Sequence, residues 1–185
     1  MNTLTDNQLM IQVRDGDVDK LGMLFERYHK KLYNFFLRIA GNRNVSEDLV
    51  QEVFFRMLKY RETYQGQSKF TTWMFKIAHN ANIDYFRKHK REEPIAENYK
   101  EPVSPDPVPE DQIEQSQEIA FIRYALAKLS LKKREVLVLS RFHNLKYDEI
   151  AELLGCRTGT VKVHVHRAIK DLEKIYTELS GGLAS

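Results

Sequence analysis

Residues 147–162 read YDEIAELLGCRTGTVK and have the pattern of a helix-turn-helix. Ile150, Ala151 and Leu154 are spaced to pack inward, and the small Ala151 permits a close crossing of two helices. Gly155 allows the positive φ angle that ends a helix, and Thr158 is a suitable N-cap for the next one. The stretch therefore predicts two helices joined by a tight turn, the second of which would enter a DNA major groove.

The helix after this turn is basic on its predicted outer side. Arginine and lysine suit phosphates and guanine, and threonine and histidine can reach base edges. The outward residues are Arg157, Thr160, Lys162, His164 and Arg167, with His166 and Lys170 nearby. The alternative is a charged, solvated helix in an ordinary four-helix domain. The helix end at Gly155, the helix start at Thr158 and the basic charge of the second helix together favour DNA binding.

Composition restricts the class of protein further. The 185 residues are 42% hydrophobic and 30% charged, as in an ordinary globular protein. The single cysteine, Cys156, excludes an intrachain disulfide framework and fits a reducing compartment. Apolar runs fall far short of the roughly 20 residues of a membrane helix, and the N-terminus lacks the apolar core of a signal peptide. We expect a cytoplasmic protein with no membrane insertion.

Charge divides the chain into three parts. Residues 1–91 have a net charge of +6, residues 92–114 of −7, and residues 115–185 of +4. All five prolines lie in the acidic part. Proline blocks helix formation and like charges extend the chain, so this part predicts a linker between two domains. A surface loop within one domain is the alternative, but about 20 residues without structure are long for such a loop.

We therefore expect a first domain at residues 1–92, a flexible acidic linker at 93–115 and a second domain at 116–185. Apolar residues at spacings of three and four predict that both domains are all-α. The predicted helices cover about 6–14, 21–40, 46–60 and 71–91 in the first domain, and about 119–129, 131–142, 147–154 and 158–175 in the second. Ser46 is the predicted N-cap of the third helix. No stretch of useful length predicts a β-strand.

The basic end of the helix at 71–91 is a weaker signal. Aromatic rings beside cations suit unpaired nucleic acid, because bases stack on the rings while phosphates meet the cations. The aromatics include Phe70 and Trp73, and the cations are Arg87, Lys88, Lys90 and Arg91. Cations are also common at any helix C-terminus, and a tryptophan at helical spacing is more often a core residue.

The outer face of the helix at 46–60 is the third candidate surface. It presents Asp48, Gln51 and Glu52, with Phe55 off the main apolar stripe. A mixed-charge face is usually only solvated, so these residues alone favour solvent over a protein partner.

The sequence has no motif that indicates catalysis. It has no Gly-rich phosphate loop, no cysteine pair and no nucleophile elbow. His164 and His166 point to different sides of a helix, a poor arrangement for one metal ion. We expect no enzyme activity, no cofactor and no metal.

Three motifs in the right order resemble the extracytoplasmic-function (ECF) sigma factors of the sigma-70 family. They are DLVQEVF at 48–54, WMFKIAHN at 73–80 with DYFRK at 84–88, and the stretch 147–167. The resemblance covers nearly the whole chain. It implies sigma region 2 at about 21–91, region 4 at about 119–178, and a bacterial subunit that gives core RNA polymerase promoter recognition and melting.

The resemblance also implies roles for individual residues. Duplex DNA of the −35 element would be read by Arg157, Thr158, Thr160, Lys162, Val163, His164, His166 and Arg167. The melted −10 strand would be held by the loop 64–69 together with Lys69, Phe70, Trp73, Asn80, Asp84, Arg87, Lys88 and Arg91. The clamp helices of the largest polymerase subunit would dock on Asp48, Gln51, Glu52 and Phe55. Region 4 would also meet the flap of the second-largest subunit, and an anti-sigma factor is the expected regulatory partner.

One residue departs from the family pattern. His164 stands where many relatives have arginine, which alters the expected −35 preference. We expect its protonation to raise DNA affinity as the pH falls through about 6.5. A stand-alone helix-turn-helix regulator with a helical N-terminal domain is the alternative function, and it predicts a stable homodimer. A helical adaptor protein is a third interpretation, but it does not require the basic helices.

Overall fold

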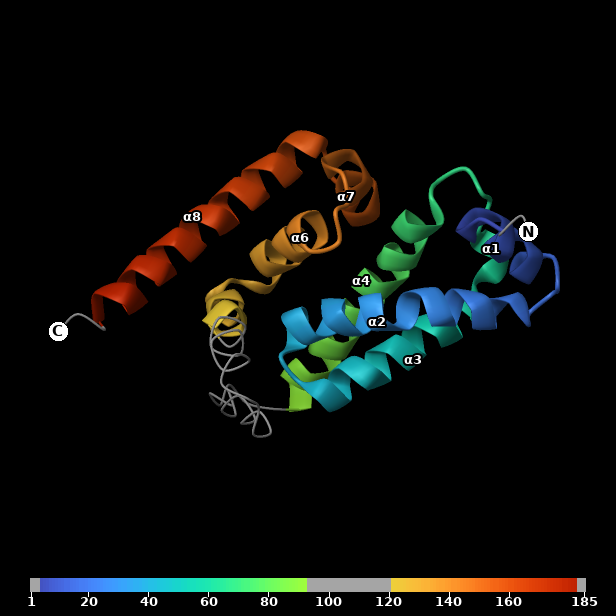
Figure 1. Cartoon of the computed structure of the whole chain (residues 1–185), viewed down its shortest axis with the longest axis horizontal. Coiled ribbons are helices and arrows are strands. Elements are labelled where there is room, and N and C mark those ends of the chain that lie inside the picture. Colours follow the sequence, from blue (N-terminus) through green and yellow to red (C-terminus); the bar gives the residue numbers. More distant parts are fainter. Residues whose placement is uncertain (1–3, 93–120, 183–185) are drawn as a thin grey trace, which may run out of the picture.

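The computed structural model describes the backbone of residues 4–92 and 121–182, and the predicted linker at 93–115 lies outside these residues. Figure 1 shows two groups of helices side by side, α1–α4 in the first domain and α6–α8 in the second. The elements are α1 (Asp6–Arg14), α2 (Lys20–Ala40), α3 (Arg43–Lys59), the 3₁₀ turn η1 (Arg61–Thr63), α4 (Phe70–Glu92), a helical segment at 121–128, α6 (Leu131–Arg141), α7 (Tyr147–Leu154) and α8 (Thr158–Gly182). The described residues contain no strand, and the predicted all-α class is confirmed.

The start of α3 differs from the prediction. The helix begins at Arg43, and the side-chain oxygen of Asn42 accepts a hydrogen bond from the amide of Val45 at 3.1 Å. Ser46, the predicted cap, lies one turn inside the helix, fully buried, and its hydroxyl donates to the carbonyl of Asn42. The left-handed Gly41 ends α2 and leaves Asn42 extended, so the earlier of two competing caps is used.

The first domain is built around the aromatic face of α2. Phe35 is fully buried, and its ring lies 5.1 Å from Phe36 and 5.4 Å from Phe75 of α4, centroid to centroid. Edge-to-face pairs at such distances add specificity to simple burial. Helix α3 packs on both α2 and α4, and α1 packs across α2. The result is a rigid support for the outer faces of α3 and α4.

The second domain packs onto the first. Helix α6 contacts α2, and α7 contacts α4. The imidazole of His79 on α4 lies 2.8 Å from the carboxylate of Glu135 on α6, which is only 5% exposed. At the edge, the ammonium of Lys69 pairs with Glu149 of α7 at 2.6 Å. The composition of the linker makes domain mobility the default expectation but does not say whether the domains touch, and in this structure the two are in direct contact.

His143 sits at the centre of this contact. Its ring lies 5.7 Å from Phe35 and 5.0 Å from Phe75, between centroids. Burial, helped by the nearby cations Arg38 and Lys31, lowers the pKa of His143 to about 4. The imidazole is therefore neutral at physiological pH and behaves as an aromatic core side chain.

We predict that the protein loses stability as the pH falls from about 6.5 to about 4, because unfolded His143 takes up a proton that the folded site resists. The contribution is complete above the ordinary pKa and amounts to at most about 3 kcal/mol. Urea unfolding of the wild type and of His143→Phe, at neutral pH and near the folded pKa, measures it. The variant keeps the aromatic contact and should lose less stability than the wild type. Equal losses in the two proteins would contradict the assignment.

Candidate nucleic-acid interface

The helix-turn-helix has the predicted turn. Gly155 has φ +63° and ends α7, and the amide of Cys156 donates to the carbonyl of Ala151 at 3.0 Å. Ile150 and Ala151 are 0% and 5% exposed, as their spacing predicts. Leu154, also predicted to pack inward, is only partly buried, and its neighbour Leu153 is 3% exposed instead. Because the turn fixes the crossing of α7 and α8, it sets which side of α8 faces solvent.

The prediction that Thr158 is the N-cap of α8 is wrong. This threonine is already the first residue of the helix, and the amide of Val161 donates to the carbonyl of Arg157 at 3.3 Å. Arg157 therefore precedes the first turn. The turn after Gly155 is one residue shorter than a Thr158 cap would make it. Helix α8 therefore begins one residue earlier in the sequence than this cap predicts.

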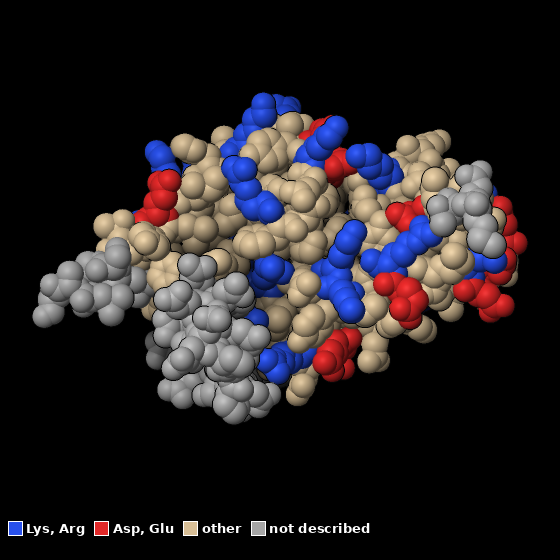
Figure 2. All heavy atoms as spheres, viewed as in Figure 1, with Lys and Arg blue, Asp and Glu red and all other residues tan. Residues whose placement is uncertain are grey.

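The outward side of α8 agrees with the predicted pattern. Val161, Val165 and Ala168 are at most 1% exposed and form the inner stripe. Thr158 and His164 are partly buried at the edge of this stripe. The remaining predicted −35 residues are exposed, namely Arg157, Thr160, Lys162, Val163, His166 and Arg167. In the view of Figure 2, lysine and arginine side chains are spread over both domains rather than gathered in one cluster.

The charge state of His164 is set by its neighbours. Partial burial lowers the pKa of His164, and the cations Lys132, Arg167 and Lys133 lower it further. The imidazole is therefore less protonated at a given pH than an isolated histidine. The pH window expected for its effect on DNA binding moves below the ordinary value of 6.5.

The start of α4 gathers the aromatic candidates for the −10 strand. Phe70 is 1% exposed, so its ring is a core side chain and is not available as a stacking platform. Trp73 is partly buried, 5.2 Å from the ring of Tyr64. Lys69 is exposed apart from its pair with Glu149, which raises the pKa of Lys69. Burial alone would raise the pKa of Glu149, but its bonds to Lys69 and to the Lys146 amide outweigh this and lower it.

The other −10 candidates lie further along α4. Asn80, Arg87 and Lys88 are exposed, and the side chain of Arg91 lies outside the described residues. Asp84 accepts from Arg56 of α3 at 2.8 Å and from Arg87 at 2.9 Å. This carboxylate therefore orients cations on two helices.

The outer face of α3 carries the candidates for polymerase docking. Asp48 and Gln51 are exposed, and Phe55 is 61% exposed, an unusually open position for a large apolar ring. Glu52 is held by Arg56 at 2.6 Å. Arg56 thus joins the docking face to Asp84 on α4. Sequence spacing gave no signal for this link, because its partners are 28 residues apart.

Two remaining features bear on the class of protein. Within the part of the chain that the structure describes, no three His, Cys, Asp or Glu side chains come together as a metal site would require. The described helices also include none with the length and apolarity needed to span a membrane.

Comparison with known proteins agrees with this geometry. The family model Sigma-70 region 2 matches residues 24–92, and Sigma-70, region 4 matches residues 122–172. The ECF RNA polymerase sigma factor SigW of Bacillus subtilis is 32% identical to this chain, over 91% of this chain and 95% of SigW. CnrH, solved in complex with the cytosolic domain of CnrY, has a TM-score of 0.73 at 21% identity, over 94% of this chain and 97% of CnrH. RpoE, solved with the anti-sigma factor NepR from Bartonella quintana, has a TM-score of 0.66 at 23% identity, over 84% of this chain and 96% of RpoE.

The paired helical domains and the basic helix-turn-helix define a transcription protein of the sigma type. The chain belongs to the ECF sigma factors of the sigma-70 family and is an RNA polymerase sigma factor. The resemblance inferred from its motifs is confirmed. Sigma factors are transcription initiation factors rather than enzymes.

Two glycines of the helix-turn-helix provide a matched test of its turn. Gly155→Ala should destabilise the protein by about 1 kcal/mol, because a Cβ is disfavoured at its positive φ. Gly159→Ala, in the first turn of α8, should be neutral or stabilising by up to about 1 kcal/mol, because alanine is the better helix former. A Cβ at either position has nothing within 4 Å, so steric clash does not complicate the comparison. Urea unfolding gives both values, and equal effects would contradict the assigned turn.

Proposed function

We propose that the two domains divide promoter recognition between them. In this proposal, region 4 reads the duplex −35 element through the first turns of α8, and region 2 holds the melted −10 strand. The observation that carries the −35 assignment is the two-sided character of α8. Its apolar residues Val161, Val165 and Ala168 are buried, while basic and hydrogen-bonding side chains are exposed over the same turns.

For the −10 strand, the support comes from the start of α4. A cation at Lys69, a partly buried indole at Trp73 and an exposed amide at Asn80 offer charge, stacking and hydrogen bonding in succession along the chain. Arg87 and Lys88 continue this line with phosphate-binding charge. Phe70 supports the site from within the core rather than by direct contact.

For the polymerase, we propose two docking surfaces. The clamp helices of the largest subunit would bind α3 at Asp48, Gln51, Glu52 and Phe55. The flap of the second-largest subunit would bind region 4, where an apolar groove of about 450 Å³ is available. The groove is lined by apolar side chains that include Phe121, Ile122, Leu126, Leu172 and Tyr176.

An anti-sigma factor is the proposed regulatory partner. Two proteins of similar fold, CnrH and RpoE, were solved with the cytosolic domain of CnrY and the anti-sigma factor NepR respectively. This chain has exposed apolar side chains in both domains that such a partner could cover, among them Phe55 and Ile122. We further propose that the protein acts in the bacterial cytoplasm, where core polymerase is found.

The −35 assignment predicts a strong effect at the start of α8 and none further along it. Lys162→Ala should weaken binding by roughly 1–3 kcal/mol if the lysine reads a base, and by less, with a smaller salt dependence, if it contacts phosphate. Lys174→Ala is the matched control, because Lys174 is also exposed but lies about 18 Å further along the same helix. Affinity is measured with holoenzyme and a promoter duplex selected from a random-sequence library. Equal promoter affinities of the two variants would contradict the assignment of the first turns of α8 to the −35 element.

The docking assignment predicts a loss of polymerase affinity without a loss of fold. Phe55→Ser should weaken binding to core RNA polymerase by about tenfold, the effect of losing one apolar anchor. Val18→Ser is the control, because Val18 is a similarly exposed apolar residue, at 44%, outside the proposed surface. Co-elution with purified core and a fluorescence titration supply the affinities. Failure of the wild type to bind core would overturn the proposed function as a whole.

A further inference from the structure

Helix α1 lies outside the residues matched by the region 2 family model, yet it lines the loop that leads into α4. The guanidinium of Arg14 donates to the carbonyl of Tyr64 at 3.4 Å. One turn earlier, Ile11 closes over Gly66, where an added Cβ would lie 3.2 Å from the end of the Ile11 side chain. The loop thus follows α1 along the length of the helix.

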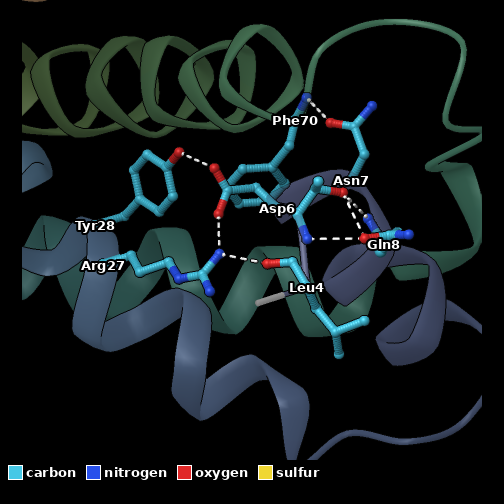
Figure 3. A network of polar contacts seen from close by, with 8 residues as sticks. Leu4, Asp6, Asn7, Gln8, Arg27, Tyr28 and Phe70 are labelled. Atoms are coloured by element: carbon cyan, nitrogen blue, oxygen red, sulfur yellow. Dashed lines mark hydrogen bonds and ion pairs between the residues drawn. The ribbon is translucent and has the colours of Figure 1, made fainter. Parts of the chain in front are cut away.

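The contact ends at Asn7, whose side chain uses both of its polar atoms. The amide oxygen of Asn7 accepts a hydrogen bond from the backbone amide of Phe70 at 2.9 Å (Figure 3). The amide nitrogen donates to the carbonyl of Ser68 at 3.4 Å. Phe70 is the first residue of α4, so its amide has no partner within the helix. Asn7 therefore caps α4 from a different helix.

The position of Asn7 is itself fixed by the residue before it. Asp6 pairs with Arg27 of α2 at 2.6 Å and accepts a hydrogen bond from the hydroxyl of Tyr28. Figure 3 shows these two bonds on one side of the first turn of α1 and the Asn7–Phe70 bond on the other. The ring of Tyr28 also lies 5.2 Å from that of Phe70, edge to face. Adjacent residues thus connect α2 to the start of α4.

We propose that α1 is part of the promoter-opening module, and that Asn7 is a positioning residue that holds the loop 64–69 and the first turn of α4 in register for the −10 strand. Asn7 acts through the backbone of Ser68 and Phe70 and does not itself contact DNA. This inference rests on the proposed −10 role of the same loop. It extends that role to a helix that the family model does not include.

Two substitutions separate the hydrogen bond from general effects on α1. Asn7→Ala removes both bonds while replacing asparagine with a better helix former, so α1 itself is not weakened. Asn7→Asp keeps an acceptor for the Phe70 amide and adds a negative charge that a helix N-terminus favours. The conservative variant should therefore keep the cap on the Phe70 amide that the alanine variant loses, although it gives up the bond to the Ser68 carbonyl, because a carboxylate cannot donate. Circular dichroism and urea unfolding check that each variant is folded.

The first measurement is exchange of the Phe70 amide hydrogen, followed by NMR in the free protein. In Asn7→Ala this exchange should be about fivefold faster, the factor expected for loss of a helix cap, and in Asn7→Asp it should stay near the wild type. The second measurement is promoter opening by holoenzyme, read from permanganate reactivity of thymines on a promoter selected from a random-sequence library. Opening should fall about fivefold in Asn7→Ala, with affinity for core polymerase unchanged.

Lys69→Ala is the reference for opening, because Lys69 is exposed in the same loop and its removal leaves the core intact. Loss of opening in both Lys69→Ala and Asn7→Ala, with rescue by Asn7→Asp, supports the inference. Loss in Lys69→Ala alone overturns the inference and leaves the proposed −10 role in place. Wild-type opening in Lys69→Ala overturns the −10 role of the loop, and the inference with it.

Discussion

One guanidinium, that of Arg134 on α6, connects the end of a helix in the first domain with the end of a helix in the second. It donates to the carbonyl of Ile39 near the end of α2, and to the carbonyls of Ala127 and Leu129 at 2.7 and 3.0 Å. These carbonyls lie at helix ends, where backbone acceptors lack partners and the helix dipole is negative. Arginine suits the position because it has five donors in a fixed plane and remains charged. One side chain thus joins two helix ends of the two domains.

Two further parts of the domain contact lie on α6 itself and on the loop that follows it. The neutral His143 packs against Phe35 of α2 and Phe75 of α4. The buried carboxylate of Glu135 has the imidazole of His79 as its partner. A buried carboxylate without such a partner would be strongly unfavourable. The contact therefore combines an apolar centre with polar pairs that specify its register. Groups of this kind are readily solvated when domains separate, which is typical of contacts within multidomain chains.

Local rules predicted most of the fold. The helix periods, the Gly155 stop and the two-sided character of α8 depend on neighbouring residues alone, and the structure has them where the sequence indicated. Capping was less predictable, because Asn42 and Ser46 are both good caps and only the geometry after Gly41 chooses between them. The burial of Phe70 was missed for a similar reason, since its ring packs on aromatics of another helix and a preceding turn.

Long-range pairs had no detectable signal in the sequence. Glu135 looks like a solvated charge beside an apolar stripe, and Asn7 like an ordinary polar residue of a short helix. Each acquires its role from a backbone or side chain more than 50 residues away. The candidate nucleic-acid residues were identified because they repeat along one helix face. Their supporting residues were not, because support comes from across the fold.

The ion pair between Lys69 and Glu149 has a consequence for any anion that seeks the same lysine. With the Glu149 carboxylate 2.6 Å from the Lys69 ammonium, an approaching phosphate finds one of the three N–H donors already used and is repelled by the negative charge of Glu149. The closed arrangement of the domains and an anionic ligand of Lys69 are therefore competitors in one equilibrium. The apparent affinity of such a ligand equals its intrinsic affinity multiplied by the fraction of molecules in which the pair is broken. Whatever separates α7 from α4 raises that fraction, and so strengthens binding at Lys69 without touching the ligand.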